Sequence, residues 1–124
     1  MDVTASRYAL DTNVALYLLG GRLLNPLPVG EFYLSIISEM ELLSYPTISQ
    51  VEESRIRQLL AQVIVIGVDE DVKNATILLR KKYRLKLPDA LICATALSVN
   101  AVLLSNDTQL ARVMEIIVNT VQIQ

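Results

Sequence analysis

Residues 8–21 read YALDTNVALYLLGG, and this stretch contains the turn from strand to helix on which the fold depends. Tyr8–Leu10 is a short apolar run that predicts a strand ending at Asp11. Thr12 and Asn13 then predict the start of a helix, and the glycine pair at the end of the stretch predicts where that helix stops. An aspartate therefore stands at a junction between a β-strand and a helix.

The same alternation continues along the chain. Further strands are predicted at residues 32–37, 63–68, 101–105 and within 115–123, and helices at 38–45, 49–62, 69–83 and 88–98, with a helical turn at 108–112. Strands that alternate with helices in this way indicate a mainly parallel sheet with helices on both faces. We therefore expect one domain, residues 1–124, with a three-layer α/β/α fold.

Local signals refine four of these elements. Ser38 with Glu41 and Ser49 with Glu52 have the spacing of capping boxes and predict two helix starts. The β-branched run 63–68 predicts a strand that is buried on both faces. Pro88 is expected at the first position of its helix, where proline is favoured.

The composition excludes several kinds of active site. The chain has 124 residues, 52% of them hydrophobic, a formal net charge of −2, no histidine and one cysteine. Histidine-dependent hydrolases and histidine-ligated zinc sites are therefore excluded, and oxygen ligands favour Mg²⁺ or Mn²⁺. Cys93 lies in an apolar run and is predicted to be a buried, inert thiol. No secretory signal or membrane span is recognised, so we expect a cytoplasmic protein.

Four acidic side chains are expected at the carboxyl edge of the sheet. Asp11 and Asp107 follow strands, Glu41 or Glu39 lies near the start of a helix after a strand, and Asp89 lies in the first turn of its helix. Each acid alone could cap a helix or complement its dipole. Together they concentrate charge, since two carboxylates about 4 Å apart repel by roughly 4 kcal/mol at an effective dielectric constant of about 20. A bound divalent cation would relieve that repulsion.

Four segments give the chain a resemblance to a known family. They are YALDTN at 8–13, SIISEMELL at 35–43, LPDALICATA at 87–96 and LLSND at 103–107. With these segments in this order, the chain resembles the PIN-domain ribonucleases, and most closely the VapC-type toxins of toxin–antitoxin pairs. The resemblance implies a PIN-like fold, Mg²⁺- or Mn²⁺-dependent endoribonuclease activity, a protein antitoxin and a homodimer.

The resemblance also implies roles for individual residues. The positions that match the family's catalytic and metal-binding acids are Asp11, Glu41, Asp89 and Asp107. Glu39 is the alternative to Glu41 and is otherwise a first-turn charge. The positions that match groups orienting the carboxylates are Thr12, Asn13 and Ser105, whose alternative role is ordinary helix capping. Attack by water would give products with 5′-phosphate and 3′-hydroxyl ends.

One basic run and one apolar helix suggest contacts with larger partners. The run comprises Arg80, Lys81, Lys82, Arg84 and Lys86. It could guide the RNA backbone towards the acids, or it could be a solvated helix end. The apolar residues within 14–27 could form a surface for a homodimer or antitoxin, or simply fill the core. Aromatic residues make up 5% of the chain, and no platform for stacking bases is recognised.

Two rival functions follow from the same residues. One is a PIN-like scaffold for RNA or protein that has lost catalysis, although all four acids are retained. The other is a phosphoacceptor or phosphatase domain with Asp11 as the nucleophile. Asn13 stands where dehalogenase-type sites have a second aspartate, so the second rival fits poorly.

Overall fold

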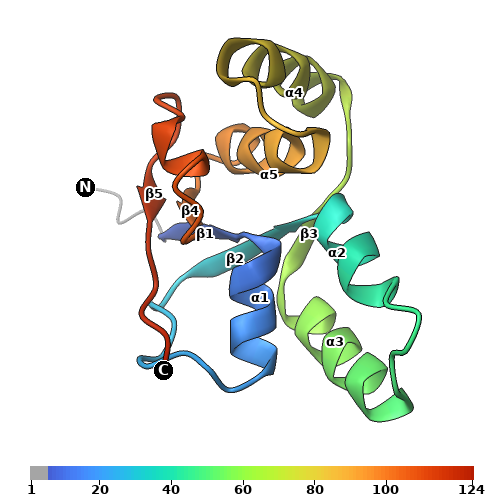
Figure 1. Cartoon of the computed structure of the whole chain (residues 1–124). Helices are drawn as coiled ribbons and strands as arrows, with labels where there is room; N and C mark the ends of the chain where they lie inside the picture. Colours follow the sequence, from blue (N-terminus) through green and yellow to red (C-terminus); the bar gives the residue numbers. More distant parts are fainter. Residues whose placement is uncertain (1–5) are drawn as a thin grey trace.

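A single parallel sheet organises the molecule (Figure 1). The computed structural model describes residues 6–124. Its strands are β1 (Arg7–Leu10), β2 (Glu31–Ser35), β3 (Ile64–Ile66), β4 (Val102–Leu104) and β5 (Val118–Asn119), in the order β3-β2-β1-β4-β5. Every neighbouring pair runs parallel. The predicted parallel sheet is therefore confirmed.

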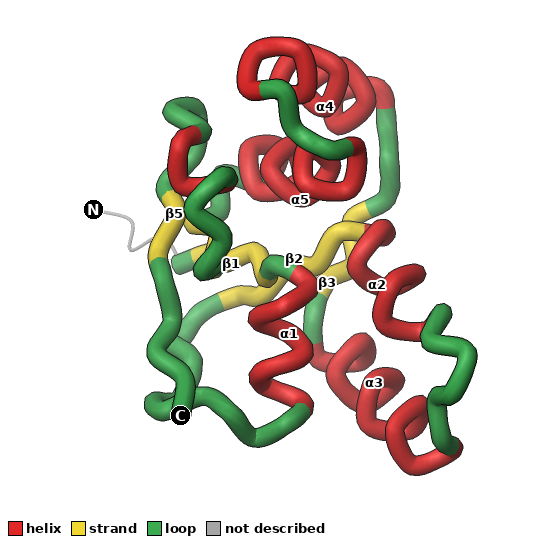
Figure 2. The backbone as a smooth tube through the Cα atoms, in the orientation of Figure 1, coloured by secondary structure: helices red, strands yellow, loops and turns green. Residues whose placement is uncertain are grey.

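Helices cover both faces of this sheet, which confirms the three-layer α/β/α arrangement (Figure 2). They are α1 (Thr12–Leu19), α2 (Ile36–Leu43), α3 (Gln50–Gln62), α4 (Glu70–Tyr83), α5 (Leu87–Ser98) and a 3₁₀ turn, Leu110–Arg112. α4 and α5 lie on one side of the sheet, and α1 and α3 on the other (Figure 1). Within residues 6–124, no helix combines the length and apolar character needed to cross a membrane.

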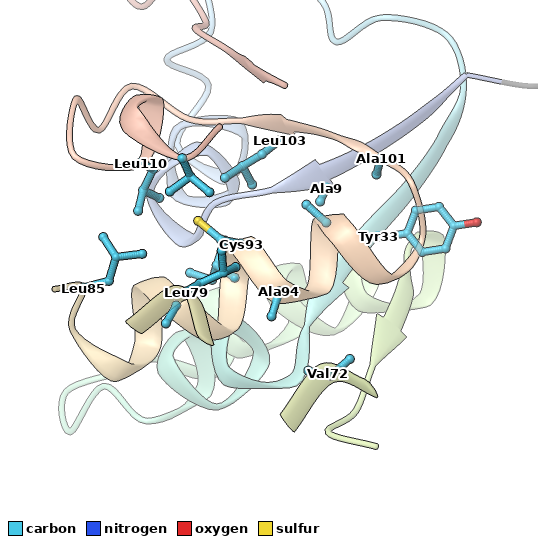
Figure 3. Packing of buried hydrophobic residues seen from close by; sticks show 14 residues of the cluster. Ala9, Tyr33, Val72, Leu79, Leu85, Cys93, Ala94, Ala101, Leu103 and Leu110 are labelled. Carbon is cyan, nitrogen blue, oxygen red and sulfur yellow. The ribbon is translucent and has the colours of Figure 1, made fainter. Parts of the chain in front are cut away.

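The strand register explains why there are two cores. Ala9 pairs with Tyr33 and Leu103, and all three side chains contribute to the core under α4 and α5. The next residue of each strand belongs to the opposite core, which α1, α2 and α3 cover. This alternation is the two-residue period of a strand buried on both faces. Figure 3 shows the first core, where Cys93 and Ala94 of α5 lie between the sheet and α4.

The prediction that residues 63–68 are buried on both faces is wrong. Only Ile64–Ile66 form a strand, and β3 lies at the edge of the sheet. Ile64 is 47% exposed and Val68 is 52% exposed. A run of β-branched residues is typical of strands in general, and its composition does not distinguish an edge strand from a central one.

The predicted start of the second helix is also wrong. α2 begins at Ile36, two residues earlier than expected, and the hydroxyl of Ser35 accepts a hydrogen bond from the backbone N–H of Ile37 at 3.2 Å. Ser38 is fully buried within the helix and forms no capping box with Glu41. Periodicity cannot separate the end of a buried strand from the start of a buried helix when both are apolar. Similarly, Pro88 occupies the second position of α5, because the helix begins at Leu87.

The capping box at the start of α3 is confirmed. The backbone N–H of Glu52 donates to Ser49 Oγ at 3.0 Å, and the backbone N–H of Ser49 donates to Glu52 Oε1 at 3.1 Å. These hydrogen bonds with Ser49 lower the pKa of the Glu52 carboxyl group. The stability that Glu52 contributes is therefore present at neutral pH and is lost as the pH falls through that lowered pKa.

We expect the Ser49→Ala variant to lose about 1 kcal/mol of unfolding free energy, because the hydroxyl is the acceptor for the first turn of α3. Urea denaturation followed by circular dichroism measures the loss. Ser54→Ala, an exposed position within the same helix, is the matched control and should not be destabilised. Equal stability of Ser49→Ala and the wild type would contradict the capping role.

Candidate active site

The chain crosses over at the middle of the sheet, and this crossover positions the site. β2 and β4 lie on either side of β1, and the chain leaves the carboxyl end of β1 towards β2 but leaves the carboxyl end of β4 towards β5, in the opposite direction. Ligand sites in parallel α/β sheets lie at such switch points. Asp11 directly follows β1, and its backbone N–H donates to the carbonyl oxygen of Leu104 at 3.1 Å. Asp11 is thereby held beside the end of β4.

A cavity of about 440 Å³ opens at this edge. Its walls come from α1, from α2 with the turn that follows it, and from α5. The lining residues are Asp11, Thr12, Asn13, Leu16, Glu41, Ser44, Tyr45, Pro46, Asp89 and Ile92. Three of the four predicted acids therefore face one cavity. Asp107 is not among the lining residues, but its charge is close enough to raise the pKa of both Asp11 and Asp89.

Asp11 is the buried acid of the group. Its residue surface is 6% exposed, and burial raises the pKa of its carboxyl group. The hydrogen bond from Ser105 opposes that rise, while the charges of Asp107 and Glu41 add to it. Asp11 occupies the N-cap position of α1, yet its side chain forms no capping hydrogen bond. Helix capping therefore does not explain this aspartate.

Ser105 connects two of the acids. Its Oγ donates to Asp11 Oδ2 at 2.6 Å and accepts a hydrogen bond from the backbone N–H of Asp107 at 3.0 Å. Asp107 Oδ1 in turn accepts from the backbone N–H of Gln109 at 2.8 Å, which fixes the turn after β4. One buried hydroxyl thus sets the positions of Asp11 and Asp107 relative to each other.

Glu41 is exposed, and a chain of hydroxyl groups orients it. Thr12 Oγ1 donates to Glu41 Oε1 at 2.8 Å, and Ser38 Oγ lies 2.8 Å from Thr12 Oγ1. Because Thr12 has only one hydroxyl proton and gives it to Glu41, Ser38 must donate to Thr12. Glu39 lies in the first turn of α2 and does not line the cavity. The structure therefore brings Glu41, rather than Glu39, to the other acids.

Asp89 completes the acidic wall from the first turn of α5. The side chain is half-buried, and burial is the largest cause of the raised pKa of its carboxyl group. The charges of Asp107 and Asp11 raise this pKa further, whereas the charge of Lys86 lowers it. Residues far apart in the chain therefore influence one another's ionisation at this edge.

The chemistry of these side chains fits a divalent cation. The four acids present only oxygen ligands, which Mg²⁺ and Mn²⁺ prefer, and their mutual repulsion favours a positive charge between them. Across residues 6–124, however, no three acidic side chains are close enough to be ligands of one ion in their present conformations. Water can complete such a site, since Mg²⁺ usually retains several water ligands.

Two further residues hold the site and were not recognised from the sequence. Ser38 was expected to cap α2 but instead supports Thr12. The side-chain amide of Asn106 donates to the carbonyl oxygen of Val121 at 3.0 Å and accepts from the N–H of Val121 at 2.8 Å. This pair of bonds fixes the residue between Ser105 and Asp107 against the C-terminal segment. Both contacts are long-range, and no local pattern indicates them.

Asn13 lies at the acidic cavity, whereas most of the basic run lies away from it. Asn13 is exposed and lines the cavity, but within the described chain its side chain forms no hydrogen bond to any of the four carboxyl groups. Lys82 is paired with Glu115 at 3.0 Å. Three other members, Arg80, Lys81 and Arg84, line a separate cavity on α4. Lys86 alone is close enough to Asp89 to change its pKa.

The apolar residues of α1 are divided between core and surface. Val14 is fully buried, whereas Leu16 and Leu19 are half-buried. A groove of about 330 Å³ lies between α1, α2 and α3, and its walls include Leu16, Leu19 and Ile56. Part of the predicted apolar surface therefore fills the core, and part lines this groove.

Cys93 lies one helical turn after Asp89 and belongs to the core under α4 and α5 (Figure 3). Burial raises the pKa of its thiol to about 12, with further contributions from the charges of Asp89, Asp11 and Asp107. The buried thiol predicted from the sequence is confirmed.

We expect Cys93 of the folded protein to resist modification by a thiol reagent such as DTNB at pH 8, because the thiolate is the reactive form and the sulfur is inaccessible. The absorbance of the thiolate that the reagent releases, followed over time, gives the rate of modification. In urea the single thiol should react fully, which serves as the control. Rapid reaction of the native protein would contradict the buried environment.

Comparison with known proteins places this site in context. The model of the PIN domain family matches residues 8–116. Similar solved structures include a toxin–antitoxin complex from Klebsiella pneumoniae, with 29% identity, coverage of 89% of this chain and 95% of that chain, and a TM-score of 0.74. VapBC-1 from nontypeable Haemophilus influenzae has 26% identity, coverage of 92% and 97%, and a TM-score of 0.71.

A more distant similarity concerns the fold alone. VapBC2 from Rickettsia felis, bound to a DNA fragment from its promoter, has 19% identity, coverage of 94% of this chain and 99% of that chain, and a TM-score of 0.78. No curated protein sequence matches the chain. The match to the family model covers every acid that lines the cavity, together with Asp107.

Proposed function

The chain belongs to the PIN domain family, and its similarity to toxin–antitoxin proteins of that family supports a nuclease; from this premise we propose that it is a divalent-metal-dependent endoribonuclease and the toxin of a toxin–antitoxin pair. The observation that carries the proposal is the shared cavity, which Asp11, Glu41 and Asp89 line, while the charge of Asp107 acts on two of them. RNA is the proposed substrate, and the cytoplasm is the proposed place of action.

Each acid has a proposed part in the hydrolysis. Asp11, Asp89 and Asp107 would hold Mg²⁺ or Mn²⁺, and Glu41 would help to hold an ion or polarise the attacking water. A bound divalent ion supplies positive charge for the phosphate and lowers the pKa of water. Thr12 donates to Glu41 Oε1, and the proposed acceptor of a proton from water is the other oxygen, Oε2. Ser105 keeps Asp11 and Asp107 in place during the reaction.

The decisive experiment is RNA cleavage with Mn²⁺, with EDTA, and with Asp89→Ala in parallel. We expect activity only in the wild type with the metal, and products with 5′-phosphate and 3′-hydroxyl ends. Asp71→Ala is the matched control, since Asp71 is also a first-turn helical acid but lies away from the cavity. Activity that survives both EDTA and Asp89→Ala would refute the metal mechanism, and a cyclic phosphate product would refute attack by water.

Ser105 provides a test of how the acids are positioned. We expect Ser105→Ala to reduce cleavage by about 10- to 100-fold, because Asp11 Oδ2 and the N–H of Asp107 both lose their hydrogen-bond partner. Ser105→Thr keeps the hydroxyl and should retain most of the activity. Steady-state cleavage rates at saturating Mn²⁺ measure both effects. Equal loss in the two variants would show that packing, rather than the hydroxyl, matters.

The groove between α1, α2 and α3 is the proposed antitoxin surface. It is lined mainly by apolar side chains, and it adjoins the acidic cavity because Leu16 and Tyr45 belong to both walls. The similar Klebsiella pneumoniae structure is a toxin–antitoxin complex, which supports a protein partner of this kind. We also propose a homodimer, which the mass measured by light scattering would test. Copurification with a coexpressed antitoxin would test the groove, because Leu19→Glu places a charge in its apolar wall and should weaken the complex.

A further inference from the structure

Most aromatic side chains of the chain are already engaged. Tyr8 and Phe32 stack on each other with ring centroids 5.5 Å apart, and Tyr33 is buried in the core. Tyr17 lies under the guanidinium group of Arg22 at 5.6 Å, and Tyr83 donates a hydrogen bond to Glu115 at 2.6 Å. Tyr45 is the remaining aromatic residue, and it is 57% exposed. Within residues 6–124, its ring has no aromatic or cationic partner.

Tyr45 stands at the acidic cavity. It follows α2 and lines the cavity together with Pro46, Ser44 and Leu16, while Asp11, Glu41 and Asp89 form the polar part of the same wall. The carbonyl oxygen of Tyr45 accepts a hydrogen bond from the N–H of Ile48 at 3.1 Å, so the backbone at this position is held in a turn. The cavity thus has carboxylates beside an accessible aromatic and apolar surface.

We propose that Tyr45 is a nucleobase-stacking residue, which holds a base of single-stranded RNA next to the phosphate that is cleaved. The inference rests on the proposed ribonuclease function and adds a substrate contact to it. A nucleotide carries a charged phosphate and an apolar, planar base within one small unit, and this cavity offers a matching pair of surfaces. Aromatic stacking tolerates every base, because each base has a π-face.

Two observations favour RNA over a protein at the cavity face of Tyr45. The surrounding carboxylates, with the metal they would hold, suit a phosphate, whereas the groove on the other side of Tyr45 is lined mainly by apolar side chains. The low aromatic content of the sequence indicates no stacking platform, because composition does not show which aromatic side chains are exposed. The exposure of Tyr45 at the cavity is the observation that the structure adds.

Kinetics of three variants test the proposal. We expect Tyr45→Ala to raise the KM for single-stranded RNA by about 5- to 150-fold, the range that loss of one stacked base produces, with kcat changed much less. Tyr45→Phe keeps the ring and should keep the wild-type KM. Leu78→Ala, an exposed apolar position on α4, should change neither constant. Urea denaturation of Tyr45→Ala verifies that the variant is folded.

Fluorescence provides a second measurement that does not depend on turnover. The chain has no tryptophan, so Tyr45→Trp introduces a single reporter at the cavity. In an Asp89→Asn background, which prevents cleavage, short mixed-sequence RNA should quench this tryptophan, whereas an abasic ribose–phosphate oligomer of equal length should not. Equal quenching by the two oligomers would show contact with the backbone rather than a base, and would overturn the proposal.

The result also separates this inference from the function on which it rests. If the wild type cleaves RNA and Tyr45→Ala has an unchanged KM, the stacking role is refuted while the ribonuclease function stands, and Tyr45 would be assigned to the protein-binding groove. If the wild type cleaves no RNA with Mn²⁺, the proposed function itself fails, and the stacking role fails with it.

Discussion

Replacement of Asp11 by asparagine is expected to abolish RNA cleavage and, in the metal-free protein, to increase the free energy of unfolding. The loss of activity should be at least about 10²- to 10³-fold, the effect of removing one preorganised charged or polar group from a reaction centre. The gain in stability has a different cause. Asp11 is a buried carboxylate near Asp107 and Glu41, and burial together with these charges raises its pKa.

The direction of the stability change follows from that raised pKa. A carboxyl group whose pKa is higher in the folded state than in the unfolded state destabilises the fold when it is ionised. The wild type should therefore lose stability as the pH rises from the ordinary aspartate value of 3.8 through the raised pKa of Asp11. Asparagine has no such charge and can still accept the hydrogen bond from Ser105. The advantage of Asp11→Asn should be largest at neutral pH and should shrink in acid.

Urea denaturation in EDTA at several pH values measures this difference, and cleavage assays with Mn²⁺ measure the activity. Asp71→Asn is the control for removal of an exposed aspartate, and it should keep full activity. If Asp11→Asn were less stable than the wild type in EDTA, Asp11 would be a structural residue that the fold requires. If the variant were active, Asp11 would not take part in hydrolysis.

Asp11 and Asp107 could be recognised from the sequence because apolar strands precede them. Asp11 directly follows β1, Asp107 lies three residues after the end of β4, and parallel strands end at one edge. The resemblance to a family then selected Glu41 over Glu39, and the structure places Glu41 at the cavity. Local pattern, fold topology and the resemblance together therefore indicated that Asp11, Glu41 and Asp89 would lie at one edge of the sheet, where they line one cavity.

The contacts that hold these acids could not be predicted in the same way. Asn106 binds the backbone of Val121, and Ser38 supports Thr12 across two helices. Such bonds depend on the relative placement of segments, which local periodicity does not encode. The start of α2 was misplaced for a related reason, since Ile36 and Ile37 suit a buried strand as well as a buried helix. The edge position of β3 depends on sheet order, which its sequence does not contain.

Binding of Mn²⁺ should stabilise the wild type strongly. A ligand that binds only the folded state adds about 2.7 kcal/mol when its free concentration is about 100 times its Kd. For a chain of 124 residues that free energy corresponds to a rise in Tm of roughly 10 °C. The unfolded chain has no histidine and one cysteine to compete for the ion, so binding to the unfolded state should be weak. Thermal denaturation with increasing Mn²⁺, followed by circular dichroism, measures the shift.

Matched variants connect this stabilisation to the cavity. Asp89→Asn should lose most of the shift, because it removes one of the acids whose repulsion the ion relieves. Asp71→Asn, which removes a first-turn acid on α4 instead, should retain it. EDTA should reverse the wild-type shift completely. An unchanged wild-type Tm at every Mn²⁺ concentration would mean that these carboxylates do not bind the ion, and since the proposed hydrolysis requires it, the scaffold alternative would then be the better explanation of the retained acids.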